Sequence, residues 1–164
     1  MQKITFLSLL FFFGSFAFGQ NEKTAVNELL ENWHKAAAEA NYDNYFTLMA
    51  PVSVFIGTDA TENWNKQEFM KWSKPYFDRG KAWSFSTLER NIFIAEDGEL
   101  AWFDELLDTQ MGICRGSGVA TKEDGRWKVK HYVLSIAIPN ENVDAVTALK
   151  AEFDKDLISR LRSN

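Results

Sequence analysis

The hydrophobic positions of this chain follow a helical spacing first and a strand-like alternation later. Over residues 24–40 apolar side chains recur every three or four positions, which predicts an amphipathic helix. A shorter helix is predicted over residues 43–49, ended by Pro51. The β-branched and aromatic run over residues 52–57 then predicts a short strand.

A third helix is predicted after a polar loop. Asn65 followed by Glu68 has the spacing of a capping box, and Pro75 should kink this helix or end its regular part. The pattern from there to Pro139 is that of strands. Beyond it the helical spacing returns, and Asn140 stands where it can cap a C-terminal helix. Helices before and after a block of strands indicate an α+β protein.

The first hairpin is predicted around Asp97-Gly98, because a type I′ turn needs positive φ at both central residues. Both faces of this hairpin carry large apolar side chains. One face should therefore cover helices, and the other a partner subunit or the terminal helix. The cross-strand pairs that follow from a two-residue loop are Phe93 with Trp102, Asn91 with Asp104 and Arg90 with Glu105.

The second hairpin turns at residues 123–125, and its register decides which side chains face the core. A two-residue loop would set His131 against Gly118. We favour a three-residue loop, because it joins Val119 to the apolar side chains of the following strand. Arg115, Ser117 and His131 would then point inward together. The predicted pairs are Trp127 with Thr121, Val129 with Val119, His131 with Ser117 and Val133 with Arg115.

These three inward residues are the first candidates for a site. A histidine near a serine and an arginine on an apolar wall is typical of a small-ligand pocket, although His131 could equally be a core histidine satisfied by neighbouring hydroxyls. Arg115 either binds a ligand carboxylate or pairs with Asp104 or Glu105 on the adjacent strand. Glu105 itself either contacts a ligand or forms an exposed ion pair with Arg90.

The first nineteen residues have the layout of a secretory signal peptide. Lys3 precedes an apolar run over residues 4–18, and Ala17 and Gly19 supply small residues at the cleavage spacing. The mature chain is expected to begin at Gln20 and to be periplasmic or secreted. The apolar run is shorter than a membrane-spanning helix requires, so no span is expected in the mature protein.

Composition argues against several kinds of partner and site. The full chain has a net charge of −5, and loss of Lys3 takes it to about −6, which argues against a nucleic-acid partner. Cys114 is alone, so no intramolecular disulfide can form. The two histidines, His34 and His131, are far apart, and no metal site or other cofactor is expected. His34 is interpreted as a partly exposed residue at the edge of the first helix's apolar stripe.

Three segments carry a resemblance to a known family. GRWKVKHYVLS has Gly125, Trp127, Val129, His131 and Ser135 where the closing strand of SnoaL-like domains has them, and FIGTDATENW and WFDELLD resemble a secreted bacterial subgroup of that family. The second histidine that many relatives carry two places later is Val133 here.

This resemblance, within the NTF2-like superfamily, implies a particular fold and a range of activities. The fold is an α+β cone, in which a curved antiparallel sheet packs against N-terminal helices. The expected division is a signal peptide over 1–19, the SnoaL-like domain over 20–140 and a C-terminal amphipathic helix over 141–164. The superfamily contains isomerase-like and cyclase-like enzymes as well as ligand-binding and protein-binding domains.

Three functions are therefore expected. The first is a pocket in the cone for an apolar or amphipathic small molecule, in a protein that forms a homodimer. The second is acid–base chemistry beside a carbonyl, which needs a base and a donor for the oxyanion. The third is a protein-interaction module whose cone is filled by its own side chains. The candidate bases are Asp59, Asp104 and His131, and the candidate donors are Tyr45, Trp64 and Arg115.

The aromatic residues allow two interpretations. Tryptophans either line a pocket for a flat hydrophobic ligand or fill the core, and the core is the expected place for most of them. Trp64, in the loop beside Asp59, is the one we expect in the pocket. The others weighed in this way are Trp72, Tyr76, Trp83 and Trp102.

Overall fold

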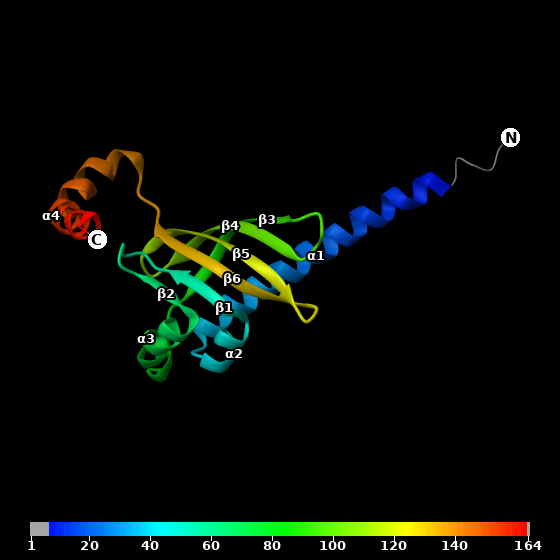
Figure 1. Ribbon diagram of the computed structural model, residues 1–164, viewed down its shortest axis with the longest axis horizontal. Helices are drawn as coiled ribbons and strands as arrows, with labels where there is room; N and C mark the ends of the chain where they lie inside the picture. The colour runs from blue at the N-terminus through cyan, green and yellow to red at the C-terminus, as the bar shows by residue number, and fades with distance from the viewer. Residues whose placement is uncertain (1–6, 164) are drawn as a thin grey trace.

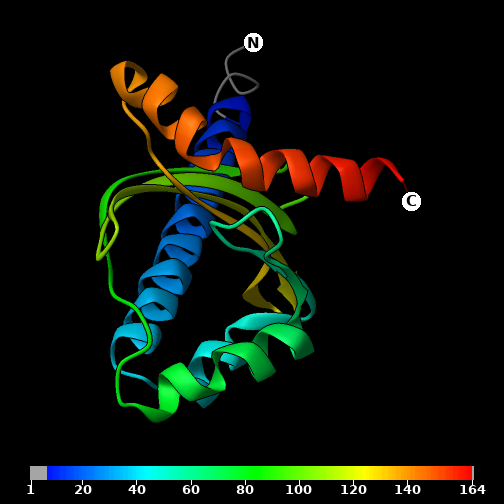
Figure 2. The ribbon, with the colours of Figure 1, turned by 90° about the vertical axis from the view of Figure 1, so that its left-hand side faces the viewer.

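A curved six-stranded sheet arches over three helices, which gives the α+β cone (Figures 1 and 2). The computed structural model describes residues 7–163, with side chains from residue 21 onward; residues 1–6 of the predicted signal peptide lie outside this range. The helices are α1 (Leu7–Ala38), α2 (Tyr42–Thr47), α3 (Lys66–Asp78) and α4 (Val143–Arg162), and a 3-10 turn, Asn140–Asn142, precedes α4. The strands are β1 (Met49–Ile56), β2 (Asn63–Asn65), β3 (Phe85–Ile94), β4 (Leu100–Thr109), β5 (Gly112–Glu123) and β6 (Arg126–Ile136).

One helix, α3, begins where the sequence signal predicts, whereas α1 begins at Leu7, well before the predicted residue 24. Asn65 caps α3: its side chain accepts a hydrogen bond from the Glu68 backbone N–H, and the Glu68 carboxylate accepts one from the Asn65 N–H. Pro75 does not end α3, which continues to Asp78. The N–H that proline lacks would have bonded to the carbonyl of Lys71, and both residues are exposed, so water can satisfy that carbonyl.

The sheet has the strand order β2-β1-β6-β5-β4-β3. All neighbours are antiparallel except β1 and β6, which run parallel, so the sheet is mixed rather than purely antiparallel as predicted. The parallel pair is possible because β1 and β6 are far apart in sequence and are linked through the rest of the domain. Pro51 lies inside β1, where the pairing with β6 is interrupted between Met49 and Val54.

The first hairpin has the predicted register but a different turn. Phe93 lies opposite Trp102, and the other two predicted pairs are also present. Gly98 has a φ of 71°, whereas Asp97 does not have positive φ, so the turn is not type I′. Instead the Gly98 N–H donates to the Ala95 carbonyl, which closes a tight turn before the left-handed glycine.

The predicted register of the second hairpin is wrong. Asp124 and Gly125 both have positive φ and form the two-residue turn of a type I′ hairpin. The register then shifts near Lys130, so that His131 lies opposite Val119. This irregularity turns the rest of β6 over, and a rule based on strict alternation cannot anticipate it. The observed pairs further along are Ser117 with Val133, Gly116 with Leu134 and Arg115 with Ser135.

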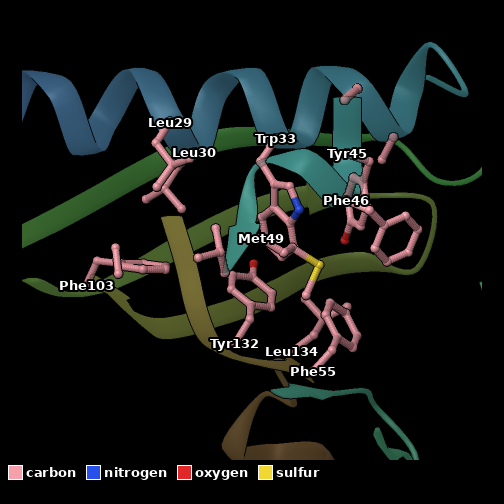
Figure 3. Close-up of a cluster of buried hydrophobic side chains, with 14 of the residues drawn as sticks. Leu29, Leu30, Trp33, Tyr45, Phe46, Met49, Phe55, Phe103, Tyr132 and Leu134 are labelled. Carbon is pink, nitrogen blue, oxygen red and sulfur yellow. The ribbon is translucent and has the colours of Figure 1, made fainter. Parts of the chain in front are cut away.

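The core lies between α1 and the concave face of the sheet (Figure 3). Trp33 of α1 is fully buried, and its ring stacks on Tyr45 with centroids 4.9 Å apart and meets Tyr132 edge-on at 4.8 Å. The residues that α1 contributes are those of its predicted apolar stripe. They are Val26, Leu29, Leu30, Trp33, Ala36 and Ala37.

The C-terminal helix α4 lies on the convex side of the sheet, opposite α2 and α3 (Figure 2). None of its residues is buried. Asn140 does not cap it, because the intervening 3-10 turn moves the helix start to Val143. Within residues 7–163, no helix combines the length and the apolar character that crossing a membrane would require.

Candidate functional site

A cavity of about 180 Å³ opens at the end of the cone formed by α3, the segment before β3 and the β4–β5 turn. Three of its side chains come from α3, and their spacing follows from the helix: Phe69, Trp72 and Tyr76 recur at three and four positions on one side. Half of the lining residues are aromatic. The full lining is Phe55, Gly57, Thr58, Glu62, Trp64, Phe69, Trp72, Tyr76, Ala82, Trp83, Phe85, Gln110, Met111 and Leu134.

Several aromatic rings of this cavity pack against one another. The Trp64 and Trp72 ring centroids are 4.5 Å apart, and Trp72 lies 4.9 Å from Tyr76. Deeper in, Phe69 stacks on Phe55 at 4.1 Å. Such stacks hold each ring in place and so give the cavity rigid walls.

Glu62 contributes the only carboxylate among the lining residues. It is half-buried, and its Oε2 atom accepts a hydrogen bond from the Asp59 N–H at 3.2 Å. Gly57 makes room for it, because a Cβ at that position would lie 2.1 Å from the same oxygen. The remaining polar side chains of the lining, apart from the Tyr76 hydroxyl and the tryptophan N–H groups, are the uncharged Thr58 and Gln110.

A second feature, a buried carboxylate, lies inside the cone. Glu105 of β4 is 1% exposed, and each of its oxygens faces two donors. Oε1 lies 2.7 Å from the Tyr132 hydroxyl and 2.8 Å from His34 Nε2. Oε2 lies 2.8 Å from both Nε and Nη2 of Arg90. Gly116 leaves the space for this arrangement, because a Cβ there would lie 2.2 Å from the Tyr132 hydroxyl.

Arg90 joins this carboxylate to α1. Its Nη1 donates to Glu31 at 2.6 Å and to Asn27 at 2.8 Å, and its Nη2 donates to Thr87 at 2.7 Å. The guanidinium therefore donates hydrogen bonds to residues on β4, on its own strand β3 and on α1. We infer that this network fixes how α1 sits against the sheet.

The network sets the protonation of its members. Burial alone would raise the pKa of Glu105, but the hydrogen bond and charge of His34, the charge of Arg90 and the hydrogen bond from Tyr132 together lower it from 4.5 to about 2. Burial, together with the negative charge of Glu105, raises the pKa of Tyr132 well above its ordinary value. Glu105 is thus ionised and Tyr132 is neutral at physiological pH.

The carboxylate network does not line the cavity. The Phe85 ring, which lines it, meets the His34 ring edge-on at 5.6 Å, so one aromatic residue separates the two features. An ionised carboxylate with four donors and a pKa of about 2 has little tendency to accept a further proton. Glu105 is therefore built to hold the fold and not to act as a base.

The predicted site residues do not come together. Arg115, Ser117 and His131 share one face of the sheet as predicted, but it is the outer face and not the inner one. The two-residue turn places Arg115 and Ser117 outward, and the irregularity in β6 places His131 on the same side. Asp104 points to the same side and accepts a hydrogen bond from Asn91 at 3.1 Å. The predicted polar island is therefore not part of the cavity.

Of the other candidates, Trp64 lines the cavity. Asp59 lies beside it, in an exposed turn where its carboxylate accepts hydrogen bonds from the backbone and hydroxyl of Thr61, which lower its pKa. Tyr45 is fully buried, and burial raises the pKa of its hydroxyl well above the ordinary value. Glu105 is buried with Arg90, so the expectation of an exposed ion pair between them is wrong.

The sequence interpretation missed several residues of the site, Glu62 among them, and it misplaced His34. Glu62 carried no signal beyond its place in the FIGTDATENW segment. His34 is 4% exposed and bonded to Glu105, so its interpretation as a partly exposed boundary residue is wrong. A buried position within the first helix's stripe was the available signal, but its partner could be found only by docking that helix on the sheet. Among the described residues, no three potential metal ligands come together.

Comparison with known proteins gives the class and the family. The curved mixed sheet, the N-terminal helices and the C-terminal helix together have the fold of NTF2-like proteins. The chain matches the SnoaL-like domain over residues 26–139, more than half its length, and belongs to that family. None of the curated proteins compared with it matches.

Solved structures share this fold at low identity. An NTF2-like protein of unknown function from Pseudomonas putida has a TM-score of 0.60 at 16% identity, covering 73% of this chain and 89% of its own. An NTF2-like protein from Cytophaga hutchinsonii has a TM-score of 0.59 at 15% identity, covering 70% and 98%. The association domain of CaMKII from C. elegans has a TM-score of 0.60 at 16% identity, covering 72% and 98%. These likenesses concern the fold.

Proposed function

We propose that this protein is exported and binds a small apolar or amphipathic molecule in the aromatic cavity. The cavity itself is the observation that carries the proposal, because rigid aromatic walls with a few polar groups are the usual make-up of a ligand site. The side chains of the core do not fill it, which argues against the interaction module with a closed cone. Acid–base catalysis has less support, since Glu105 and His34 lie behind Phe85.

Export is supported by the segment before the core. Among the α1 side chains that the structure describes, which begin at residue 21, the first buried ones are Glu22 and Val26, both after the expected cleavage point at Gly19. Glu22 accepts a hydrogen bond from the Trp127 indole at 2.7 Å and forms an ion pair with Lys122 at 2.8 Å. A chain that begins at Gln20 therefore keeps every core contact described for α1.

The proposal is tested by native mass spectrometry of the full chain expressed in a Gram-negative host and purified from its periplasm. We expect the mass of a subunit whose first residue is Gln20, increased by the mass of a retained small molecule. Trp72→Ala should lose that molecule, because this ring lines the cavity, whereas Leu161→Ala should keep it, because this residue is an exposed apolar side chain near the end of α4 that does not line the cavity. The pocket would be contradicted if neither the wild type nor Leu161→Ala retained the molecule, or if all three proteins retained it equally.

We further propose a homodimer built on the outer face of the sheet. Phe93 and Trp102 stack there with centroids 5.6 Å apart, and both remain more than 40% exposed. Ile113 and Leu100 add apolar surface on the same side of β4 and β5. Exposed aromatic residues on the open face of a sheet are typical of protein interfaces.

Size-exclusion chromatography with light scattering tests this dimer. The wild-type protein should have twice the subunit mass, and Trp102→Lys should have the mass of one subunit, because an unpaired charge cannot be buried at the centre of the interface. Leu149→Lys, at a more exposed apolar position on α4, should remain dimeric. A wild-type protein of one subunit mass would refute the proposal.

A further inference from the structure

The charge of the cavity restricts what can bind there. Among its lining residues the only ionised side chain is Glu62, and none is a lysine, arginine or histidine. A ligand carboxylate or phosphate would lie near one negative charge with no cation to compensate it. A positive charge in the same place would be stabilised, and the stabilisation would be stronger than in water because half of the lining is aromatic.

The aromatic residues favour the same sign of charge. The faces of indole and phenol rings carry negative electrostatic potential and attract cations, with tryptophan the strongest. Trp64, Trp72 and Trp83 all line the cavity, together with Tyr76. Arg79, which is not a lining residue, already places its guanidinium 4.6 Å from the centre of the Tyr76 ring. The tryptophan rings are therefore the ones left to a ligand cation.

The volume limits the size of the ligand. At about 180 Å³ the cavity is smaller than the range of about 300–1,000 Å³ that is usual for drug-sized ligands. A group the size of a trimethylammonium with a short chain fits such a space, whereas a four-ring skeleton does not. The uncharged Thr58 and Gln110 can satisfy a hydroxyl or carbonyl on that chain.

We propose that the ligand of this cavity is a small organic cation, with its ammonium group between the tryptophan rings and the Glu62 carboxylate. This proposal rests on the proposed function, since it assumes that the cavity binds a small molecule. It adds the sign of the ligand's charge and names Glu62 as the residue that selects it.

Isothermal titration calorimetry with three probes of similar shape tests the charge directly. The probes are choline, its neutral analogue in which carbon replaces the quaternary nitrogen, and pivalate as an anion. Choline should bind about tenfold more tightly than the neutral analogue, corresponding to the 1–2 kcal/mol of a partly desolvated cation–π contact. Pivalate should not bind measurably.

Variants separate the contributions of the carboxylate and the rings. Glu62→Gln should weaken choline binding about fivefold and leave the neutral analogue unchanged, whereas Trp72→Ala should weaken choline at least as much. Glu96→Gln, which removes an exposed carboxylate on the distant β3–β4 turn, is the matched control and should change neither affinity. Circular dichroism confirms that each variant is folded.

The outcomes distinguish this proposal from the one it rests on. A neutral analogue that binds as tightly as choline would overturn the cation proposal and support a small-molecule pocket. Failure of all three probes to bind would also overturn it, while the retained molecule in native mass spectrometry would decide the proposed function independently. Choline affinity that Glu62→Gln leaves unchanged would show that this carboxylate does not select the charge.

Discussion

Glu105→Ala should lower the free energy of unfolding by about 3–5 kcal/mol, the usual cost of removing one partner from a buried ion pair. The substitution leaves the Arg90 guanidinium buried and facing an empty space, and it also removes the acceptor for His34 and Tyr132. The lost hydrogen bonds join α1, β3 and β6 to β4, so the whole packing of the helix on the sheet should loosen. Urea denaturation followed by tryptophan fluorescence at neutral pH measures the change.

Asp104→Ala is the matched control for this experiment. It removes a carboxylate from the adjacent position of the same strand, but this side chain points outward and has one exposed hydrogen bond, from Asn91. Its effect should stay within about 1 kcal/mol, as for most surface substitutions. If the two variants unfolded at the same urea concentration, Glu105 would not hold the fold together in the way the hydrogen bonds indicate.

Signals between near neighbours in the sequence predicted the fold well. The capping box at Asn65 and Glu68 is a three-residue relation, and it fixes where α3 begins. The turn around Gly98 places β3 against β4, and one tight turn is enough to set the register of that pair, including Arg90 with Glu105. These features depend on local geometry, which a sequence pattern expresses directly.

The second hairpin shows where such reasoning fails. The place of the turn could be inferred, but its length could not, because two residues form it and not the predicted three. The irregularity near Lys130 then reverses the side-chain directions of the rest of β6. As a result Tyr132 points inward to Glu105, and His131 points outward. A prediction that assumes strict alternation does not allow for the extra residue, so it assigns every later side chain of β6 to the wrong face.

The site was only partly predictable for a different reason. Trp64 was expected in the pocket because it follows the first predicted strand, in the loop beside Asp59 at the expected pocket mouth. The cavity also needs Trp83 and Gln110, which come from separate connections and meet only when the sheet curves over the helices. His34 and Glu105 are 71 residues apart, and only tertiary packing brings them together.

Acidification should remove most of the stability that Glu105 provides. Its pKa is about 2 in the folded protein and 4.5 without these contacts, so the carboxylate stabilises the fold fully above pH 4.5. As the pH falls toward 2, the unfolded chain binds a proton before the folded protein does, and the stabilisation is lost. A shift of this size corresponds to about 3 kcal/mol, of which roughly 2 kcal/mol should be gone at pH 3.

Comparison with Glu105→Gln isolates this contribution, because other groups titrate in the same range. The pKa of Glu22 is lowered chiefly by its hydrogen bond from Lys122, and that of Asp59 by Thr61, so both also favour the folded state at higher pH. These groups are common to both proteins and cancel in the difference between their urea midpoints. That difference should be large at pH 7 and shrink steadily toward pH 3. A difference that is independent of pH would mean that Glu105 stabilises the fold through its shape and hydrogen bonds and not through its charge.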